Sequence, residues 1–251
     1  MRDLWNQYRI HINQRKRKDG HVYGIQFINR ENISFELQEI GRMFQAPDAK
    51  VAASLFVKRY CAYIAVLEAM SRRNMKVELP LQSISFICTE TQVAIYTLAP
   101  SVEECMNANR TLWRDRVIAR IFREHVGVII DALAKETRLA SSIMWSHVAF
   151  YVHVMYRKWI QEALSESERE RLIEDFHYLC EAPAHLFGRD EGNPFQVSFC
   201  KVQHPAQGEE VLLRRTCCLN YKAGTKGACY TCPRLTETER IRKMQQSYMK
   251  A

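Results

Sequence analysis

Four cysteines near the C-terminus constrain this chain more than any other feature of its sequence. They are Cys217, Cys218, Cys229 and Cys232, an adjacent pair followed by a Cys-x2-Cys unit. Nine cysteines in all are too many, and odd in number, for a secreted disulfide framework in a chain of 251 residues. Thiols that a cell keeps reduced are available as ligands, so the quartet predicts a metal or iron–sulfur site in the C-terminal segment.

The spacing of the quartet separates two kinds of site. A structural zinc ion usually takes two Cys-x2-Cys turns, each of which points both sulfurs at one ion. Only Cys229 and Cys232 form such a turn, whereas the side chains of the neighbours Cys217 and Cys218 are expected to diverge. A [2Fe–2S] cluster has two irons and binds four thiolates, which lie farther apart than the four ligands of a single zinc ion. The quartet therefore favours a [2Fe–2S] cluster, and a zinc clip that holds the segment together is the alternative.

The quartet closely resembles the C-terminal segment of the FhuF-like ferric siderophore reductases, which carries Cys-Cys-x10-Cys-x2-Cys around a [2Fe–2S] cluster. All four cysteines of that pattern are present, and the flanking Arg215, Thr216 and Pro233 also look like the family. The motif covers roughly the last fifth of the chain. The resemblance implies a cytoplasmic enzyme that reduces siderophore-bound Fe(III) and so releases the iron.

The chemistry expected of such an enzyme follows from ligand hardness. Siderophores hold Fe(III) through hard anionic oxygens, which suit Fe(II) much less well, so one added electron loosens the iron. We expect a ferric siderophore of the hydroxamate or citrate-hydroxamate type as substrate, and no catalytic residue beyond the cluster. The sequence shows neither a Gly-x-Gly-x-x-Gly after a strand nor a phosphate loop. Electrons are therefore expected from a separate ferredoxin, flavodoxin or flavoprotein reductase.

Positive charge is concentrated around the four cysteines. The formal net charge is +8, and residues 201–251 contain ten Lys and Arg against four Glu. Cationic neighbours would lower the pKa of the thiols, offset thiolate charge and steer an anionic chelate or an acidic electron carrier toward them. Arg214, Arg215 and Lys222 are the candidates for docking the chelate or tuning the cluster. The alternative is that these basic residues only form a solvated surface and bind neither a chelate nor a cluster.

Two other functions compete with a reductase. A zinc-stabilised nucleic-acid-binding protein would use the same basic charge, including the run over 15–18, but no recognition helix or aromatic RNA platform accompanies that run. A non-enzymatic iron–sulfur sensor would use the same four ligands. We expect the reductase and no nucleic-acid partner. No signal-peptide core and no membrane-length apolar window is visible, so we expect a cytoplasmic protein without a membrane span.

Hydrophobic periodicity predicts an α+β fold, with a mostly helical main domain, small antiparallel hairpins and a short C-terminal iron–sulfur segment. Alternating residues predict hairpins over 8–29 and 76–98 and short strands over 195–202 and 210–214. Helical spacing and capping residues predict helices over 48–74, 109–133, 139–164, 165–180 and 236–249, and a helix or strand over 34–44.

A loop rich in Gly and Pro over 182–194 is the expected boundary between a main domain, 1–194, and a cluster-bearing segment, 195–251. His147 and His153 lie six positions apart in an apolar helix, so they would not share a helix face as a metal-binding pair does. We expect both to be packed or hydrogen-bonded. The remaining cysteines are expected to fill apolar core: Cys61, Cys88, Cys105, Cys180 and Cys200.

Overall fold

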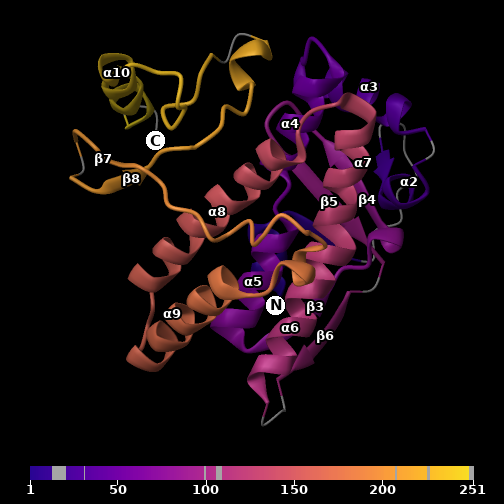
Figure 1. The fold of residues 1–251 in the computed structure, drawn as a ribbon, viewed down its shortest axis with the longest axis vertical. Coiled ribbons are helices and arrows are strands. Elements are labelled where there is room, and N and C mark those ends of the chain that lie inside the picture. Colours follow the sequence, from indigo (N-terminus) through magenta and orange to yellow (C-terminus); the bar gives the residue numbers. More distant parts are fainter. Residues whose placement is uncertain are drawn as a thin grey trace.

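The computed structural model describes residues 1–12, 21–30, 32–98, 100–105, 109–206, 208–224 and 227–248. These residues form an α+β fold in which helices predominate and the strands make small sheets, which confirms the predicted class (Figure 1). Within these ranges, no helix combines the length and the apolar character that crossing a membrane requires.

The elements follow one another along the chain as short strands set between helices. The α-helices are α1 (Arg2–Gln7), α2 (Gly24–Asn29), α3 (Ile33–Phe44), α4 (Ala49–Arg59), α5 (Ala62–Arg73), α6 (Arg110–Ile121), α7 (Gly127–Thr137), α8 (Ser141–Gln161), α9 (Glu166–Glu181) and α10 (Glu237–Tyr248). The strands are β1 (Ile10–Ile12), β2 (His21–Tyr23), β3 (Met75–Glu78), β4 (Ile84–Cys88), β5 (Val93–Thr97), β6 (Ser101–Glu104), β7 (Lys201–Gln203) and β8 (Glu210–Leu212).

The largest described sheet has the strand order β1-β5-β4-β2. Strands β4 and β5 form the hairpin predicted within 76–98, with Phe86 opposite Ile95. The hairpin predicted over 8–29 is wrong, because β1 pairs with β5 in parallel, β2 pairs with β4, and 24–29 form α2. The tight turn expected within that hairpin lies outside the described residues. Alternation identifies a strand, but it does not choose the partner strand.

The helix predicted over 48–74 is divided in two. Asp48 caps α4 as expected, since its carboxylate accepts the N–H of Val51 at 2.9 Å. At Tyr60 the backbone adopts an extended conformation, which ends α4, and α5 begins at Ala62. The Tyr60 hydroxyl makes a buried hydrogen bond with His125. The helix predicted from 109 is likewise divided, into α6 and α7, by a π-helical turn, η2 (Phe122–Val126). Tertiary contacts at these two points override the continuous helical pattern.

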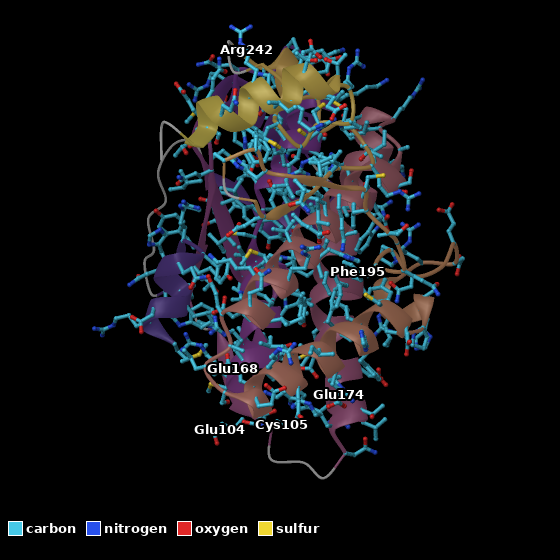
Figure 2. All side chains as sticks on the ribbon, turned by 90° about the vertical axis from the view of Figure 1, so that its left-hand side faces the viewer. Glu104, Cys105, Glu168, Glu174, Phe195 and Arg242 are labelled. Atoms are coloured by element: carbon cyan, nitrogen blue, oxygen red, sulfur yellow. The ribbon has the colours of Figure 1, made fainter. Side chains whose placement is uncertain are left out.

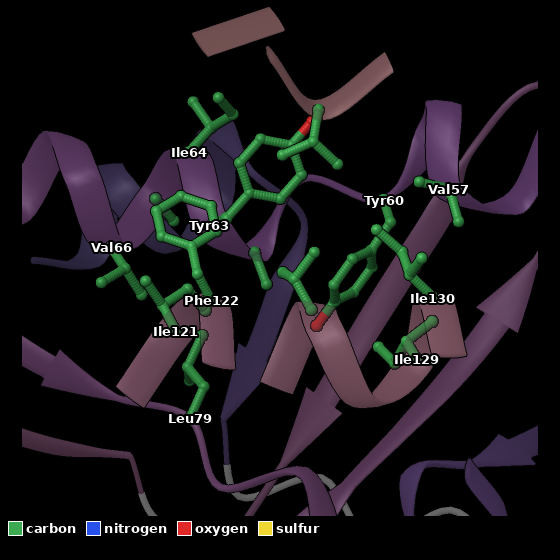
Figure 3. Packing of buried hydrophobic residues seen from close by; sticks show 14 of the residues in the cluster. Val57, Tyr60, Tyr63, Ile64, Val66, Leu79, Ile121, Phe122, Ile129 and Ile130 are labelled. Carbon is green, nitrogen blue, oxygen red and sulfur yellow. The ribbon is translucent and has the colours of Figure 1, made fainter. Parts of the chain in front are cut away.

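Aromatic and branched side chains from α4, α5, η2 and α7 pack into one core (Figure 3). Phe122 lies at its centre, with ring centroids 6.2 Å from Tyr63 and 4.9 Å from Phe195. The predicted central helix over 139–164 is α8, and its Tyr156 and Trp159 are almost inaccessible to solvent. Helix α8 extends from this core toward the C-terminal segment (Figure 1).

A buried ion cluster joins α6 to α9. The Asp175 carboxylate is fully buried and receives hydrogen bonds from Arg110 at 2.7 Å and from Arg114 at 3.1 Å. Arg114 also contacts Glu174, whose side chain is largely exposed, at 2.9 Å. Because two guanidinium groups meet one carboxylate, this charge is compensated inside the protein.

The C-terminal segment packs against the helices and does not form the whole strand predicted over 195–202. Only 201–203 are in a strand, β7, which pairs with β8. Phe195 is inserted into the core, and the Phe199 ring contacts Phe150 at 5.7 Å. Cys200 is exposed, so the expectation of apolar filler is wrong for this cysteine. The division into 1–194 and 195–251 stays a prediction.

Candidate metal centre

The structure brings the four predicted cysteines together as two pairs. The sulfur of Cys218 lies 3.9 Å from that of Cys229, and the sulfur of Cys217 lies 3.7 Å from that of Cys232. All four are free thiols. Each pair therefore combines one cysteine of the adjacent doublet with one cysteine of the Cys-x2-Cys turn.

The spacing within each pair suits one tetrahedral metal ion. Metal–sulfur bonds of about 2.3 Å place two sulfurs about 3.8 Å apart at the tetrahedral angle. Among the described residues, no three or more Cys, His, Asp or Glu side chains are grouped so that they could hold one metal ion. The quartet thus supplies two pairs of thiols. That donor set is the one a [2Fe–2S] cluster uses.

The backbone of the doublet explains how adjacent cysteines face different partners. Leu219, directly after the doublet, has a left-handed conformation with φ of 61°, which turns the chain sharply. Its N–H points back to the Cys217 sulfur at 3.4 Å. The Cys-x2-Cys turn is closed by the N–H of Cys232, which donates to the carbonyl of Cys229 at 2.9 Å.

The loop between the two cysteine motifs is fixed at its two ends. Asn220 donates from its side-chain amide to the carbonyl of Gly227 at 3.0 Å. Gly224 has φ of 54° and donates its N–H to the carbonyl of Gln45 at 3.1 Å. A Cβ on Gly224 would lie 2.4 Å from the Gln45 side-chain oxygen, so only glycine fits here without displacement.

Helix α4 holds the doublet through Ser54. The buried Ser54 hydroxyl donates to the carbonyl of Cys218 at 3.1 Å and lies 3.0 Å from Nε2 of His147. Because the hydroxyl has one proton, His147 is the donor in the second bond. Burial holds the pKa of His147 well below its usual value, so this imidazole is neutral.

The histidine predictions are confirmed. His147 is hydrogen-bonded in the core, and His153 interacts through Nε2 with the carbonyl of Phe195 at 3.0 Å. Neither belongs to a metal-binding group in the part of the chain that the structure describes.

Lys58 supplies a positive charge directly to one thiol pair. It lies one helical turn after Ser54 on α4, and its Nζ donates to the sulfur of Cys229 at 3.1 Å. The pKa of Cys218 is lowered to about 5, mainly by the hydrogen bond with Cys229 and to a smaller extent by the charges of Lys58 and Arg214. Burial opposes this shift. The hydrogen bond with Cys218 and burial raise the pKa of Cys229. The pair thus shares one proton and holds one thiolate.

The second pair combines the half-buried Cys217 with the buried Cys232. Burial raises the pKa of Cys217 to about 11, only partly offset by the N–H of Leu219. Cys232 is 3% exposed. Metal binding by Cys217 therefore requires release of its proton.

Of the three predicted basic residues, the structure places Arg214 beside the thiols. Its guanidinium lies 4.1 Å from the Phe150 ring centroid and 4.7 Å from that of Tyr151, and the residue is 5% exposed. Its backbone N–H donates to the carbonyl of Thr231 at 3.0 Å. Arg215 and Lys222 are exposed on the surface instead.

Helix α10 holds the Cys-x2-Cys turn through hydrogen bonds from Arg240. Thr236 and Glu239 form the predicted capping box at its start, with bonds of 3.3 and 2.9 Å. Arg240 donates to the carbonyl of Tyr230 at 2.8 Å and to that of Cys232 at 3.1 Å. Arg242, by contrast, points away from the fold (Figure 2).

Two cavities lie on either side of Lys58 and Tyr151. The larger, of about 940 Å³, lies between α8 and β8 and includes Cys229 in its lining. The smaller, of about 400 Å³, is lined by Arg9, Arg59 and aromatic side chains. The larger cavity thus gives a ligand direct access to one of the candidate metal ligands.

Comparison of the chain with protein-family models, curated proteins and solved structures finds no match. The likeness to the siderophore reductases consequently depends on the cysteine motif alone.

Proposed function

We propose that this protein is a cytoplasmic ferric siderophore reductase whose four C-terminal cysteines hold a [2Fe–2S] cluster. The observation that supports this most is the arrangement of the thiols as two pairs, 3.7 and 3.9 Å apart. Cys218 and Cys229 would hold one iron, and Cys217 and Cys232 the other. When bound, such a cluster supplies transfer of single electrons.

The surrounding residues fit this role by positioning and by charge. Ser54 and Arg240 fix the backbone carbonyls of Cys218 and Cys232, one in each cysteine motif. The ammonium group of Lys58 donates a hydrogen bond to the sulfur of Cys229 and compensates thiolate charge. Such rigid, cationic surroundings favour four thiolates close together in a partly buried site.

The reaction needs little else from the protein. The substrate is Fe(III) held by anionic oxygens, and one electron converts it to Fe(II), which those oxygens hold weakly. The proposal includes a separate electron donor, a ferredoxin, flavodoxin or flavoprotein reductase. Oxidation of NADPH by the purified protein and ferric chelate, without a mediator, would contradict that part.

Anaerobic purification followed by metal analysis and visible spectroscopy tests the proposal. We expect a reddish-brown protein with about two irons per chain, bleached by dithionite and reoxidised by a ferric siderophore. Cys229→Ser should lose the colour, whereas Cys200→Ser, at an exposed thiol outside the quartet, should keep it. A colourless protein with one zinc would refute the cluster. A coloured protein that ferric chelates fail to reoxidise would refute the reductase and favour a sensor.

A further inference from the structure

We propose that the cavity between α8 and β8 is the chelate-binding site and that it selects ferric chelates of net negative charge. The inference rests on the proposed function, since it names the substrate class of the same site. It assigns the binding role to Lys58 and Arg214 in the cavity, and not to the exposed Arg215 and Lys222.

The position and the size of the cavity suit a whole chelate. Its lining includes Cys229 and Thr231 from the cysteine segment, Tyr151 and Val154 from α8, and Val211 from β8. Its volume of about 940 Å³ is near the upper end of the range for ligand pockets, about 300–1,000 Å³. A chelate bound here would lie against a proposed iron ligand, which gives the electron a short path.

The charges of the lining are ordered from the floor to the rim. At the rim, the exposed Glu210 meets Arg157 at 3.2 Å, and the exposed Glu162 meets Lys158 at 3.7 Å. Opposite charges there largely cancel one another. The third carboxylate of the lining, Glu209, is also exposed, where water screens its charge.

The floor of the cavity is cationic. Lys58 is half-buried and Arg214 is buried, and neither forms a salt bridge with a carboxylate among the described residues. Nε and Nη1 of Arg214 are buried without a hydrogen-bond partner there. Lys58 shares its charge with Cys229, whereas the Arg214 guanidinium has no carboxylate partner in the described part of the chain. A buried cation without a carboxylate partner favours an anion nearby, and a low local dielectric strengthens that attraction.

Aromatic rings complete the recognition surface. The Arg214 guanidinium lies over the rings of Phe150 and Tyr151, and Tyr230 also lines the cavity. A citrate-hydroxamate chelate, which is anionic, matches this floor, whereas a trihydroxamate chelate with a pendant ammonium group is repelled by it.

The smaller cavity fits the chelate less well. It shares Lys58 and Tyr151 and adds Arg9 and Arg59, but its described lining includes none of the four cysteines of the quartet. Its volume of about 400 Å³ is also less than half that of the larger cavity.

Gallium(III) chelates test the site separately from electron transfer, because Ga(III) is not reduced under these conditions. Isothermal titration calorimetry should show the anionic gallium citrate-hydroxamate binding at least about tenfold tighter than a cationic gallium trihydroxamate. Val154→Trp, which fills the cavity, should weaken binding of the anionic chelate by at least about tenfold. Leu112→Trp adds the same ring at an exposed position on α6 and should leave binding unchanged.

The charge selection has its own test at Lys58. Lys58→Gln should reduce the preference for the anionic over the cationic chelate, and Lys58→Arg should retain it. This preference is the ratio of two affinities measured on the same sample, so it does not depend on the fraction of folded protein. Equal binding of both chelates by the native protein, or unchanged binding by Val154→Trp, would overturn the inference. Iron content and reoxidation by ferric chelate, measured on the same samples, show independently whether the reductase proposal stands.

Discussion

The most informative single substitution is Ser54→Ala, because this hydroxyl joins α4, α8 and the cysteine doublet. It bonds to the carbonyl of Cys218 at 3.1 Å and to Nε2 of His147 at 3.0 Å, and Ser54 is fully buried. Alanine would remove both bonds without a large change in volume. The imidazole N–H and the carbonyl would then stay buried without partners.

The size of the effect follows from those two unpaired groups. Each buried polar group left without a partner destabilises a protein by about 1–3 kcal/mol. Ser54→Ala should therefore lower the free energy of unfolding by about 2–6 kcal/mol. Because the Cys218 backbone loses its anchor, iron should also leave the protein several times faster.

Urea titration and the rate of iron release to a competing chelator measure the two effects. Ser71→Ala is the matched control, because Ser71 is fully buried on α5 and its hydroxyl lies 2.8 Å from that of Tyr156. The control should lose about 1–2 kcal/mol and release iron at the native rate. If Ser54→Ala behaved like Ser71→Ala in both measurements, the doublet would not depend on α4.

Two further substitutions test other parts of the structure. Arg240→Met removes the donor that fixes the carbonyl of Cys232, so iron release should accelerate, whereas Arg242→Met, on the outer face of α10, should not change it. Asp175→Asn removes the buried carboxylate that Arg110 and Arg114 share and should cost about 3–5 kcal/mol in urea unfolding, against less than about 1 kcal/mol for the exposed Glu174→Gln. Equal effects within either pair would contradict the corresponding assignment.

The parts of the fold that depend on neighbouring residues could be predicted from the sequence. The caps at Asp48 and Thr236 are confirmed because a cap is decided within four residues. The partner of β1 could not be predicted, since β5 is far away in the sequence and alternation does not choose between partners. The break at Tyr60 also depends on a distant residue, His125.

The same distinction applies to the candidate metal centre. Spacing within the cysteine motif identified the thiols, but not their nested pairing, to which the left-handed Leu219 contributes. Lys58 and Ser54 were missed because they come from α4, and no signal in the sequence links that helix to the C-terminal segment. Arg215 was expected at the site because it is close in sequence, yet it faces solvent.

The nested pairing places one ring of the chain inside another between Cys217 and Cys232. Contact between Cys218 and Cys229 closes the inner ring, and contact between Cys217 and Cys232 closes the outer one. Bridging the inner sulfurs brings the outer two almost into place, so the second closure restricts the chain far less than the first. Loading would consequently be cooperative and ordered from the inside outward, and loss of an inner sulfur would harm assembly more than loss of an outer one.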